Sequence, residues 1–353
     1  MNKTLLRAAA WLAAIVLLLA AGGYAWYRSL DLDSLPKANP QATVADLAFL
    51  KKPVTQKRGR ILAVVSSTER GGPAMKKAGY ELTELARAYY VFQANGYEVD
   101  IASPQGGKPP ERIDLDDMGD ADYAFLNDAA AQHKVVNSIP LAGIDASRYA
   151  AVYFVGGKGA MHDLPDNPDV ARIVGDIAGR GVVGAVCHGP AALLGVKLAD
   201  GKPLVAGRRM TGFTNEEELF LMKDARTRFG FLLEERAVAQ GARFVAGPKY
   251  IDNTVVDGRL VTGQNAWSSW SVAEAMITAL GHRPVARERT AEEVSVRLLA
   301  TYYRDGFDAA RKQQSGLAPF ARFDKMLVLM HSVVAAMQWR AADAVNLQRL
   351  ANT

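Results

Sequence analysis

The stretch VVGAVCHGPAALLG, residues 182–195, is apolar up to Cys187 and then continues with His188, Gly189 and Pro190. The β-branched residues before the cysteine predict a short strand buried on both faces. Proline suits the first turn of a helix, because its missing N–H would have had no partner there. The stretch therefore predicts a strand that turns directly into a helix, as in a nucleophile elbow, with cysteine in the place of serine.

Apolar runs alternate with amphipathic stretches on both sides of this junction. Runs rich in β-branched residues predict strands, and the periodic stretches between them predict helices. Such alternation indicates an α/β fold, a mostly parallel sheet with helices on both faces. We expect strands over 60–67, 97–104, 149–157 and 182–188, a strand or hairpin over 202–213, short strands over 243–247 and 253–263, and helices over 80–94, 168–181, 189–198, 215–230 and 268–282.

Cys187 is the only cysteine of the chain, so neither an intramolecular disulfide nor a cysteine-based zinc site is expected. At a helix N-terminus, the dipole and the free N–H groups favour the thiolate, which is the nucleophilic form. The alternative is a buried structural cysteine, the commoner fate of a single thiol. Position alone leaves both interpretations open.

The overall composition is that of a globular protein, with 49% hydrophobic and 22% charged residues. The net charge of +5 is small for 353 residues. We find no block of lysine and arginine interleaved with aromatic residues, the pattern that a nucleic-acid groove needs. Nucleic acid is therefore not an expected partner, and no histidine spacing predicts a metal site.

The N-terminus carries Lys3 and Arg7 ahead of an uncharged run from Ala8 to Tyr27. Twenty residues in a helix span about 30 Å, the thickness of the hydrocarbon core of a bilayer. This length predicts that residues 1–28 are a signal anchor, one transmembrane helix of a bacterial-type inner membrane. With the basic residues first, the positive-inside rule keeps them in the cytoplasm, so the folded domain would be exported. A cleavable signal peptide is the alternative, because small residues follow the apolar run.

Three further segments complete the expected organisation. Residues 29–59 are polar and contain prolines, which predicts a linker. Residues 60–282 form the folded α/β domain. Residues 283–353 are expected to be a helical extension, with helical periodicity over 290–314 and 320–350. These helices could pack on protein, mediate a homodimer or rest on the membrane.

Three motifs resemble the DJ-1/PfpI superfamily, and within it the Hsp31-like branch. They are AVCHGPAALLG, VYFVGGKGAMHDL and VVDGRLVTGQNAWSSWSVAEAMI, and the similarity extends from about Arg60 to His282 in the same order. The resemblance implies a flavodoxin-like fold. It also covers the segment KKAGYELTELARAYYVFQANGYEVDIASPQGG, in which the branch carries a glutamate five residues after a glycine.

The resemblance implies a role for three residues around the junction. Cys187 is the implied nucleophile, His188 its partner and Glu84 the carboxylate beside the sulfur. A carboxylate near a thiol can take and return a proton if burial brings its pKa close to neutral. Otherwise Glu84 would be an exposed helix glutamate, as most glutamates are.

The tract TGFTNEEELF contains the implied third member of a triad. The branch places an acid at the position of Glu218, which would orient the histidine ring. Glu216 and Glu217 are the neighbouring alternatives. An acidic triplet at a helix start is also favoured by the helix dipole alone.

The glycine turn at residues 156–159 follows the third strand, at the sheet edge where open α/β folds bind ligands. The N–H groups of Gly156, Gly157 and His188 could bind an oxyanion there. Lys158 stands where the branch usually has histidine, which changes the charge at the mouth of the pocket.

Two residues after this turn are weaker candidates. His162 and Asp163 could line the pocket, although Asp163 is expected to cap the helix that follows.

A thiol with a carboxylate and an oxyanion pocket suits attack on a carbonyl carbon. The resemblance implies glutathione-independent glyoxalase activity on a small carbonyl substrate, methylglyoxal, which becomes lactate without a cofactor. Cys187 would form a hemithioacetal, and Glu84 would move a proton between the two carbons. The alternatives are a cysteine peptidase or amidase, a holdase chaperone and a glutamine amidotransferase-like domain.

Overall fold

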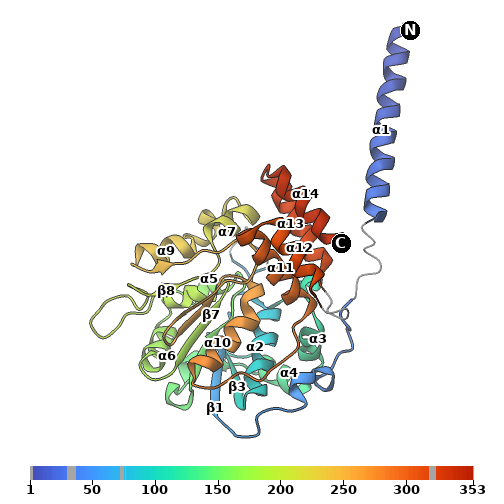
Figure 1. Cartoon of the computed structure of the whole chain (residues 1–353). Coiled ribbons are helices and arrows are strands. Elements are labelled where there is room, and N and C mark those ends of the chain that lie inside the picture. The colour runs from blue at the N-terminus through green and yellow to red at the C-terminus, as the bar shows by residue number, and fades with distance from the viewer. Residues whose placement is uncertain (1–2, 30–36, 72–74, 76, 318–322, 353) are drawn as a thin grey trace. The chain divides into compact units, whose positions relative to one another are not determined.

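A seven-stranded sheet forms the centre of residues 38–289, one of two units into which the computed structural model divides. The other unit consists of residues 1–37 and 290–353 (Figure 1). The structure describes residues 3–29, 37–71, 75, 77–317 and 323–352.

The strand order of the sheet is β10-β11-β7-β6-β1-β3-β5, and only β10 and β11 pair antiparallel. The prediction of a mostly parallel α/β sheet is therefore confirmed. The strands are β1 (Gly59–Val64), β3 (Tyr97–Ser103), β5 (Ile139–Pro140), β6 (Ala151–Phe154), β7 (Val182–Val186), β10 (Thr254–Asp257) and β11 (Leu260–Gly263). Two small parallel pairs accompany it, β2 (Tyr80–Glu81) with β4 (Glu111–Arg112) and β8 (Arg209–Met210) with β9 (Arg243–Phe244).

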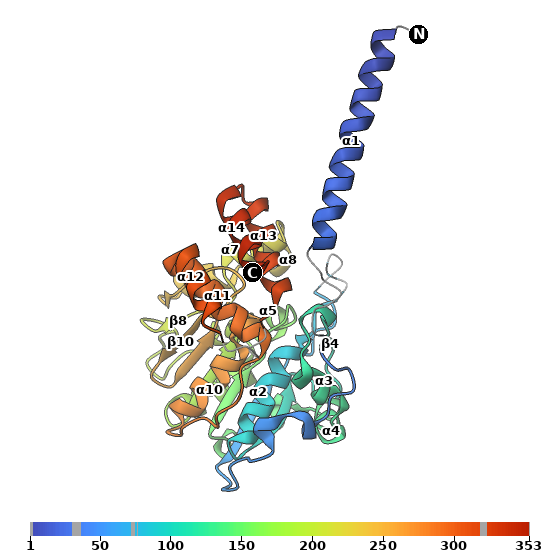
Figure 2. The ribbon, with the colours of Figure 1, turned by 45° about the vertical axis from the view of Figure 1, so that its right-hand side comes forward.

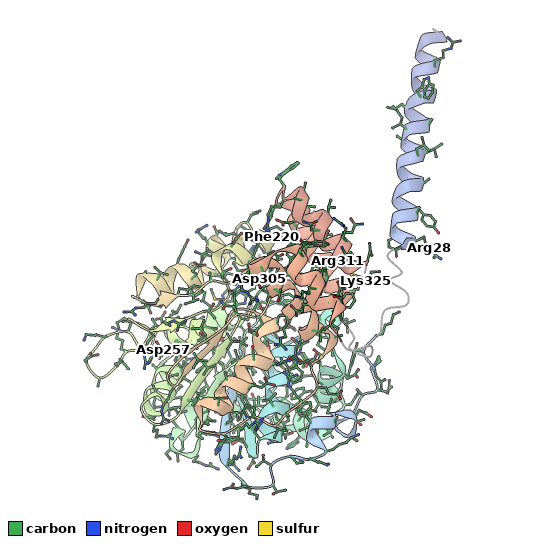
Figure 3. All side chains as sticks on the ribbon, in the orientation of Figure 1. Arg28, Phe220, Asp257, Asp305, Arg311 and Lys325 are labelled. Carbon is green, nitrogen blue, oxygen red and sulfur yellow. The ribbon has the colours of Figure 1, made fainter. Side chains whose placement is uncertain are left out.

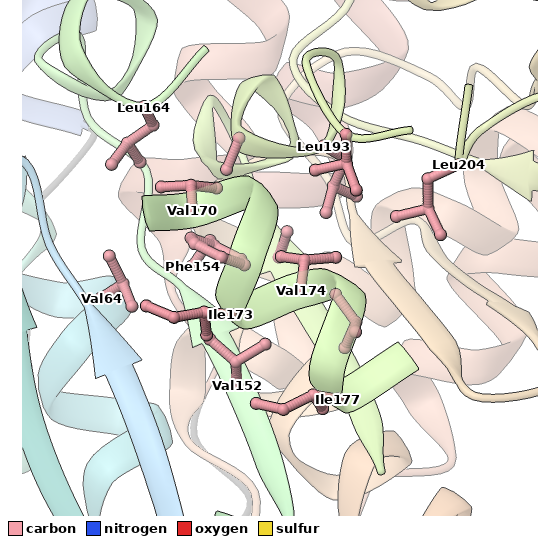
Figure 4. Close-up of a cluster of buried hydrophobic side chains, with 14 of the residues drawn as sticks. Val64, Val152, Phe154, Leu164, Val170, Ile173, Val174, Ile177, Leu193 and Leu204 are labelled. Carbon is pink, nitrogen blue, oxygen red and sulfur yellow. The ribbon is translucent and has the colours of Figure 1, made fainter. Parts of the chain in front are cut away.

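Helices cover both faces of the sheet, as the alternation of side chains along β6 shows. Val152 and Phe154 pack into the apolar core with α6 (Pro168–Ala178) (Figure 4). Tyr153 points to the opposite face, where its hydroxyl reaches α2 (Leu82–Ala94). α10 (Ser269–Ala279) lies beside α2 on that face (Figure 1 and Figure 2).

The remaining helices of this unit are short. They are α3 (Asp120–Asn127), α4 (Ala129–Val136), α5 (Ala160–Asp163), α7 (Asn215–Leu221), α8 (Ala225–Phe229) and α9 (Leu233–Ala239), with the 3₁₀ turns η2 (Val44–Asp46), η3 (Ala48–Leu50), η4 (Leu115–Asp117), η5 (Leu141–Gly143), η6 (Ala146–Arg148), η7 (Gly189–Leu193) and η8 (Ala266–Ser268).

Several predicted elements are shorter than their sequence pattern suggested. The helix expected over 189–198 is only the 3₁₀ turn η7, because the chain turns at Gly195 and then forms a bridge between Lys197 and Pro203. The helix expected over 215–230 is interrupted by Met222, whose backbone is extended. The strand or hairpin expected over 202–213 contains only the two residues of β8.

The C-terminal unit contains more helices than the two predicted patterns. They are α11 (Ala291–Asp305), α12 (Phe307–Ser315), α13 (Lys325–Met337) and α14 (Ala341–Ala351). Gly306 has a φ of 88°, so it ends α11 before α12 begins, and Trp339 with a φ of 60° separates α13 from α14. The start of the second pattern, at Phe320, lies outside the described residues. α13 packs against α14 and α11.

Helix α1 (Lys3–Ser29) corrects the prediction of a transmembrane anchor. None of the helices in the described part of the chain combines the length and the apolarity that crossing a membrane requires. The prediction rested on the twenty uncharged residues from Ala8 to Tyr27, ten of which are alanine or glycine. The predicted membrane partner and the single-pass inner-membrane location depended on that helix and are wrong as well, and the prediction of an exported domain loses its basis.

Candidate active site

The turn between β7 and η7 holds Cys187 in a strained backbone conformation. Cys187 has a φ of 58°, the left-handed region, which costs a residue other than glycine about 1–3 kcal/mol. Its N–H donates to the Gly263 carbonyl at 3.0 Å, and its carbonyl accepts from the Phe213 N–H at 2.8 Å. These bonds on both sides fix the sulfur at the carboxyl end of the parallel strands, as an elbow requires.

His188 connects the thiol to a buried carboxylate. The Cys187 Sγ lies 3.4 Å from His188 Nδ1, and His188 Nε2 lies 2.6 Å from Glu218 Oε2. All three side chains are buried. The geometry is that of a nucleophile, a base and an orienting acid in one line.

Glu218, and not its two neighbours, contacts the histidine because α7 begins immediately before the triplet. The Thr214 side chain accepts from the Glu217 N–H and forms a capping box with it. Glu217 is fully buried, and its carboxylate accepts hydrogen bonds from Thr214, Tyr250 and Asn265. Glu216 is exposed and pairs with Lys249. Three consecutive glutamates therefore have three different environments.

Glu84 lies on the other side of the sulfur, on the first turn of α2. Its carboxyl is fully buried, accepts from the Gly156 N–H at 2.7 Å and contacts the Cys187 thiol. Burial raises the pKa of Glu84 to about 8, although these two hydrogen bonds and nearby Arg87 lower it. Oε1 of this carboxyl is buried without a hydrogen-bond partner among the described residues, so it is available to take up a proton.

The surroundings of the thiol disfavour the thiolate, which was one of the two interpretations that its position in the sequence left open. Burial first, and then the neighbouring Glu84 carboxyl, raise the pKa of Cys187 well above its usual value. The element after the cysteine is the five-residue 3₁₀ turn η7, whose dipole is smaller than that of the helix we expected. Formation of the thiolate therefore requires a base, and His188 Nδ1 is within contact distance of the sulfur.

The glycine turn after β6 brings backbone N–H groups to the same place. A Cβ on Gly156 would lie 2.6 Å from Glu84 Oε2 and 2.8 Å from the Cys187 Cβ, so only glycine fits. Gly157 has a φ of 89°, and its N–H points to the Cys187 sulfur. Lys158 is partly buried in the same turn and has no ion pair within the described part of the chain.

Asp163 does not have its predicted capping role, and His162 lies near the site. Asn167 caps α6, whereas Asp163 accepts from the Ser67 N–H at 2.7 Å. The His162 ring lies 5.4 Å from that of Phe229, and burial together with nearby His188 lowers its pKa.

Sequence reasoning missed four residues of this region. The Tyr153 hydroxyl donates to the Glu84 carbonyl at 3.0 Å and fixes the start of α2. Burial, and then the Glu84 carboxyl, raise the pKa of Glu81 to about 9. The rings of Phe213 and Phe229 lie 4.5 and 6.0 Å from the His188 ring. Glu81, Tyr153 and Phe213 lie within the motifs of the Sequence analysis, and this was their only signal in the sequence. Ring contacts between distant segments leave no spacing pattern.

No group of three or more histidine, cysteine, aspartate or glutamate side chains in the described ranges is arranged to hold a metal ion. The groups gathered around Cys187 are those of proton transfer and nucleophilic addition.

Comparisons with known proteins agree with this geometry. Residues 75–279 match the profile of the DJ-1/PfpI family. A probable glutathione-independent glyoxalase of Saccharomyces cerevisiae is 33% identical over 235 residues, which cover 62% of this chain and 97% of the relative. Glyoxalase 3 of Candida albicans is 32% identical over 228 residues, with 62% and 97% covered.

Two solved structures have a similar fold. The 24 kDa Rapid Encystment Protein of Francisella tularensis is similar at a TM-score of 0.60 with 31% identity, covering 63% of this chain and 99% of that one. The crystal structure of glyoxalase III from Candida albicans is similar at a TM-score of 0.59 with 27% identity, covering 63% and 97%.

Proposed function

The chain belongs to the DJ-1/PfpI family, and from this membership we propose that it is a glutathione-independent glyoxalase that converts methylglyoxal to lactate. Its relatives include proteins named glutathione-independent glyoxalase and glyoxalase 3. One observation supports the proposal above all. The Cys187 sulfur lies between two groups that can move protons, His188 Nδ1 at 3.4 Å and the Glu84 carboxyl.

The first step is addition of the thiol to the aldehyde. His188 Nδ1 takes the thiol proton, and the imidazolium that forms is stabilised by Glu218 at 2.6 Å. The sulfur attacks the aldehyde carbon, and its carbonyl oxygen becomes an alkoxide that the N–H groups of Gly157 and His188 can bind. The imidazolium returns the proton to this oxygen, which gives a hemithioacetal.

The second step is an internal oxidation and reduction. The Glu84 carboxylate removes the proton from the former aldehyde carbon, and the electron pair forms a double bond to the ketone carbon, which leaves an enediolate with its charge on the former ketone oxygen. The hydroxyl proton of the hemithioacetal passes to that oxygen, Glu84 returns its own proton to the former ketone carbon, and the sulfur-bearing carbon becomes the carbonyl carbon of a thioester. One carbon is oxidised and its neighbour reduced, so the step needs no external oxidant or reductant.

The last step is hydrolysis. Water adds to the thioester, lactate leaves, and the Cys187 thiol is restored. The burial of Glu84 suits this sequence, because a pKa of about 8 lets one carboxyl both take and release a proton near neutral pH.

The experiment is turnover of methylglyoxal in the absence of glutathione. We expect the wild-type chain to form lactate, Cys187→Ala to form none above background, and Glu84→Gln to form it about 1,000-fold more slowly. Lactate formation by Cys187→Ala at the wild-type rate would exclude the mechanism. Circular dichroism of each variant controls for loss of the fold.

A cysteine peptidase would share Cys187, His188 and Glu218 with this mechanism. Peptide cleavage needs a cleft that admits an extended chain, whereas the Cys187 side chain is buried, with 7% of its surface exposed. Glu84 also has no role in peptide cleavage. Hydrolysis of casein that survives in Glu84→Gln but not in Cys187→Ala would favour the peptidase.

A further inference from the structure

Phe213 contacts both members of the Cys187–His188 pair, through different parts of the residue. Its backbone N–H donates to the Cys187 carbonyl at 2.8 Å. Its ring lies against the face of the His188 imidazole, with ring centroids 4.5 Å apart and planes inclined by 34°. Phe213 is buried. Phe229, which also lies beside His188, is farther away, with ring centroids 6.0 Å apart.

The contact of the ring complements the two polar contacts of the imidazole. Cys187 Sγ and Glu218 Oε2 lie near Nδ1 and Nε2, so they fix two points of the ring. Both contacts are at the edge of the imidazole, so they restrain its rotation about the Cβ–Cγ bond less than a surface packed on its face does. An aromatic surface packed on one face restricts that rotation, because the stacked planes would have to separate.

The ring also favours the charge that catalysis places on His188. The electron-rich face of an aromatic ring attracts a cation, and such a contact contributes about 0.5–2 kcal/mol depending on burial. The imidazolium that forms when His188 accepts the thiol proton would gain this interaction. Neutral imidazole gains less.

Chain connectivity adds a third role. Phe213 immediately precedes Thr214, the N-cap of α7, and that helix carries Glu218. The neighbouring Gly212 lies close to the Cys187 carbonyl, since a Cβ there would lie 3.2 Å from that oxygen. A displacement of Phe213 would therefore disturb the hydrogen bond to the Cys187 carbonyl and, at the same time, the start of the helix that carries Glu218.

We infer that Phe213 is a positioning residue that holds His188 in the plane needed to take the Cys187 proton. The inference rests on the proposed function for its catalytic readout only. It predicts that loss of the ring lowers kcat and leaves KM nearly unchanged, because the ring contacts the base and not the substrate.

The experiment compares Phe213→Leu with Phe220→Leu. Phe220 lies on α7 of the same segment and packs on Tyr250 at 6.2 Å, so it controls for loss of an aromatic side chain (Figure 3). We expect Phe213→Leu to lower kcat about tenfold with KM within about twofold, an effect of roughly the size of a desolvated ring–cation contact. Phe213→Tyr keeps the ring and should recover most of kcat.

A second readout does not depend on glyoxalase activity. The rate of Cys187 alkylation by iodoacetamide reports formation of the thiolate, and its pH midpoint should rise by about half a unit in Phe213→Leu. The substitution alters none of the titratable or charged side chains near the pair. These are Glu84 and Arg87 of α2, Tyr153 of β6, His162 of α5, and Glu217 and Glu218 of α7.

Each outcome decides between the alternatives. Wild-type kcat and an unchanged alkylation profile in Phe213→Leu would overturn the inference, as would an equal loss in Phe220→Leu. If Phe213→Leu does not fold by circular dichroism, Phe213→Met retains an apolar side chain of similar volume without the ring and takes its place. If wild type does not turn over methylglyoxal, the proposed function fails, and the alkylation profiles still test Phe213.

Discussion

The first turn of α2 and the first turn of α7 each bring a buried glutamate to the same cysteine–histidine pair. On α2, Glu84 contacts the thiol and accepts from the Gly156 N–H. On α7, Glu218 contacts His188 Nε2 at 2.6 Å. The two residues have the same side chain and similar burial, but one has a thiol and a peptide N–H as partners, whereas the other has a basic ring.

The difference indicates how one residue type serves two functions. No positively charged group contacts the Glu84 carboxyl among the described residues, so burial raises its pKa to about 8. With this pKa, the carboxyl can exchange its proton during a reaction. Glu218 instead contacts a partner that becomes positive when it takes a proton, so its suitable role is to orient the ring and stabilise that charge. The partner, more than the burial, distinguishes the two glutamates.

The largest expected effect comes from removing the exchangeable proton of Glu84. Glu84→Gln keeps the shape and the bond from the Gly156 N–H, but it cannot act as a base. We expect kcat for methylglyoxal to fall about 1,000-fold, within the range that general base catalysis contributes. Steady-state lactate formation measures it. A loss of less than tenfold would mean that another group carries the proton.

A smaller loss of kcat is expected when Glu218 is replaced. Glu218→Gln can still accept a hydrogen bond, but it no longer stabilises the imidazolium, and we expect kcat to fall about 100-fold. The Cys187 alkylation rate at pH 7 should fall as well. In Glu84→Gln, alkylation should not fall, because the base for the thiol is His188. The opposite pattern would reverse the two assignments.

The pH profile separates the two glutamates with unaltered protein. The Glu84 carboxylate is the active form and its pKa is about 8, so kcat/KM should rise about tenfold between pH 7 and pH 9. Glu218→Gln should keep this rise at its lower rate. A profile of wild type that is flat over this interval would contradict the role of Glu84.

Stability should depend on pH through the same carboxyl. Its pKa in the folded chain, about 8, lies above the value of about 4.3 in the unfolded chain. Its stabilising contribution is therefore complete below about pH 4 and is lost as the pH rises through 8. The melting temperature of Glu84→Gln relative to wild type should rise by roughly 10 °C between pH 5 and pH 8. Thermal denaturation at both pH values tests this, and a constant difference would contradict it.

The smallest effect is expected at the exposed member of the α7 triplet. Glu216 pairs only with Lys249 at the surface, and such pairs contribute about 1 kcal/mol or less. Glu216→Gln should keep kcat within twofold of wild type. It is the matched control for Glu218→Gln, because both remove one carboxylate from the same helical turn.

Local sequence predicted much of this arrangement. β-branched runs predicted β1, β3, β6 and β7, and the break at Gly189 and Pro190 predicted the sharp turn at Cys187. Glu84 and Glu218 were identified through motif spacing and a family resemblance, and the structure brings Glu84 to Cys187 and Glu218 to His188. The uncharged run from Ala8 to Tyr27 predicted a membrane span, and the described helices contain none.

The sequence by itself determined the order of strands and helices, because periodicity and turn residues act over a few positions. Only the tertiary structure decided the protonation of Cys187 and Glu84, the choice of Glu218 over Glu216 and Glu217, and the ring of Phe213 against His188. These depend on burial and on contacts between segments far apart in the chain. Dielectric surroundings and packing distances arise only once the sheet has brought those segments together.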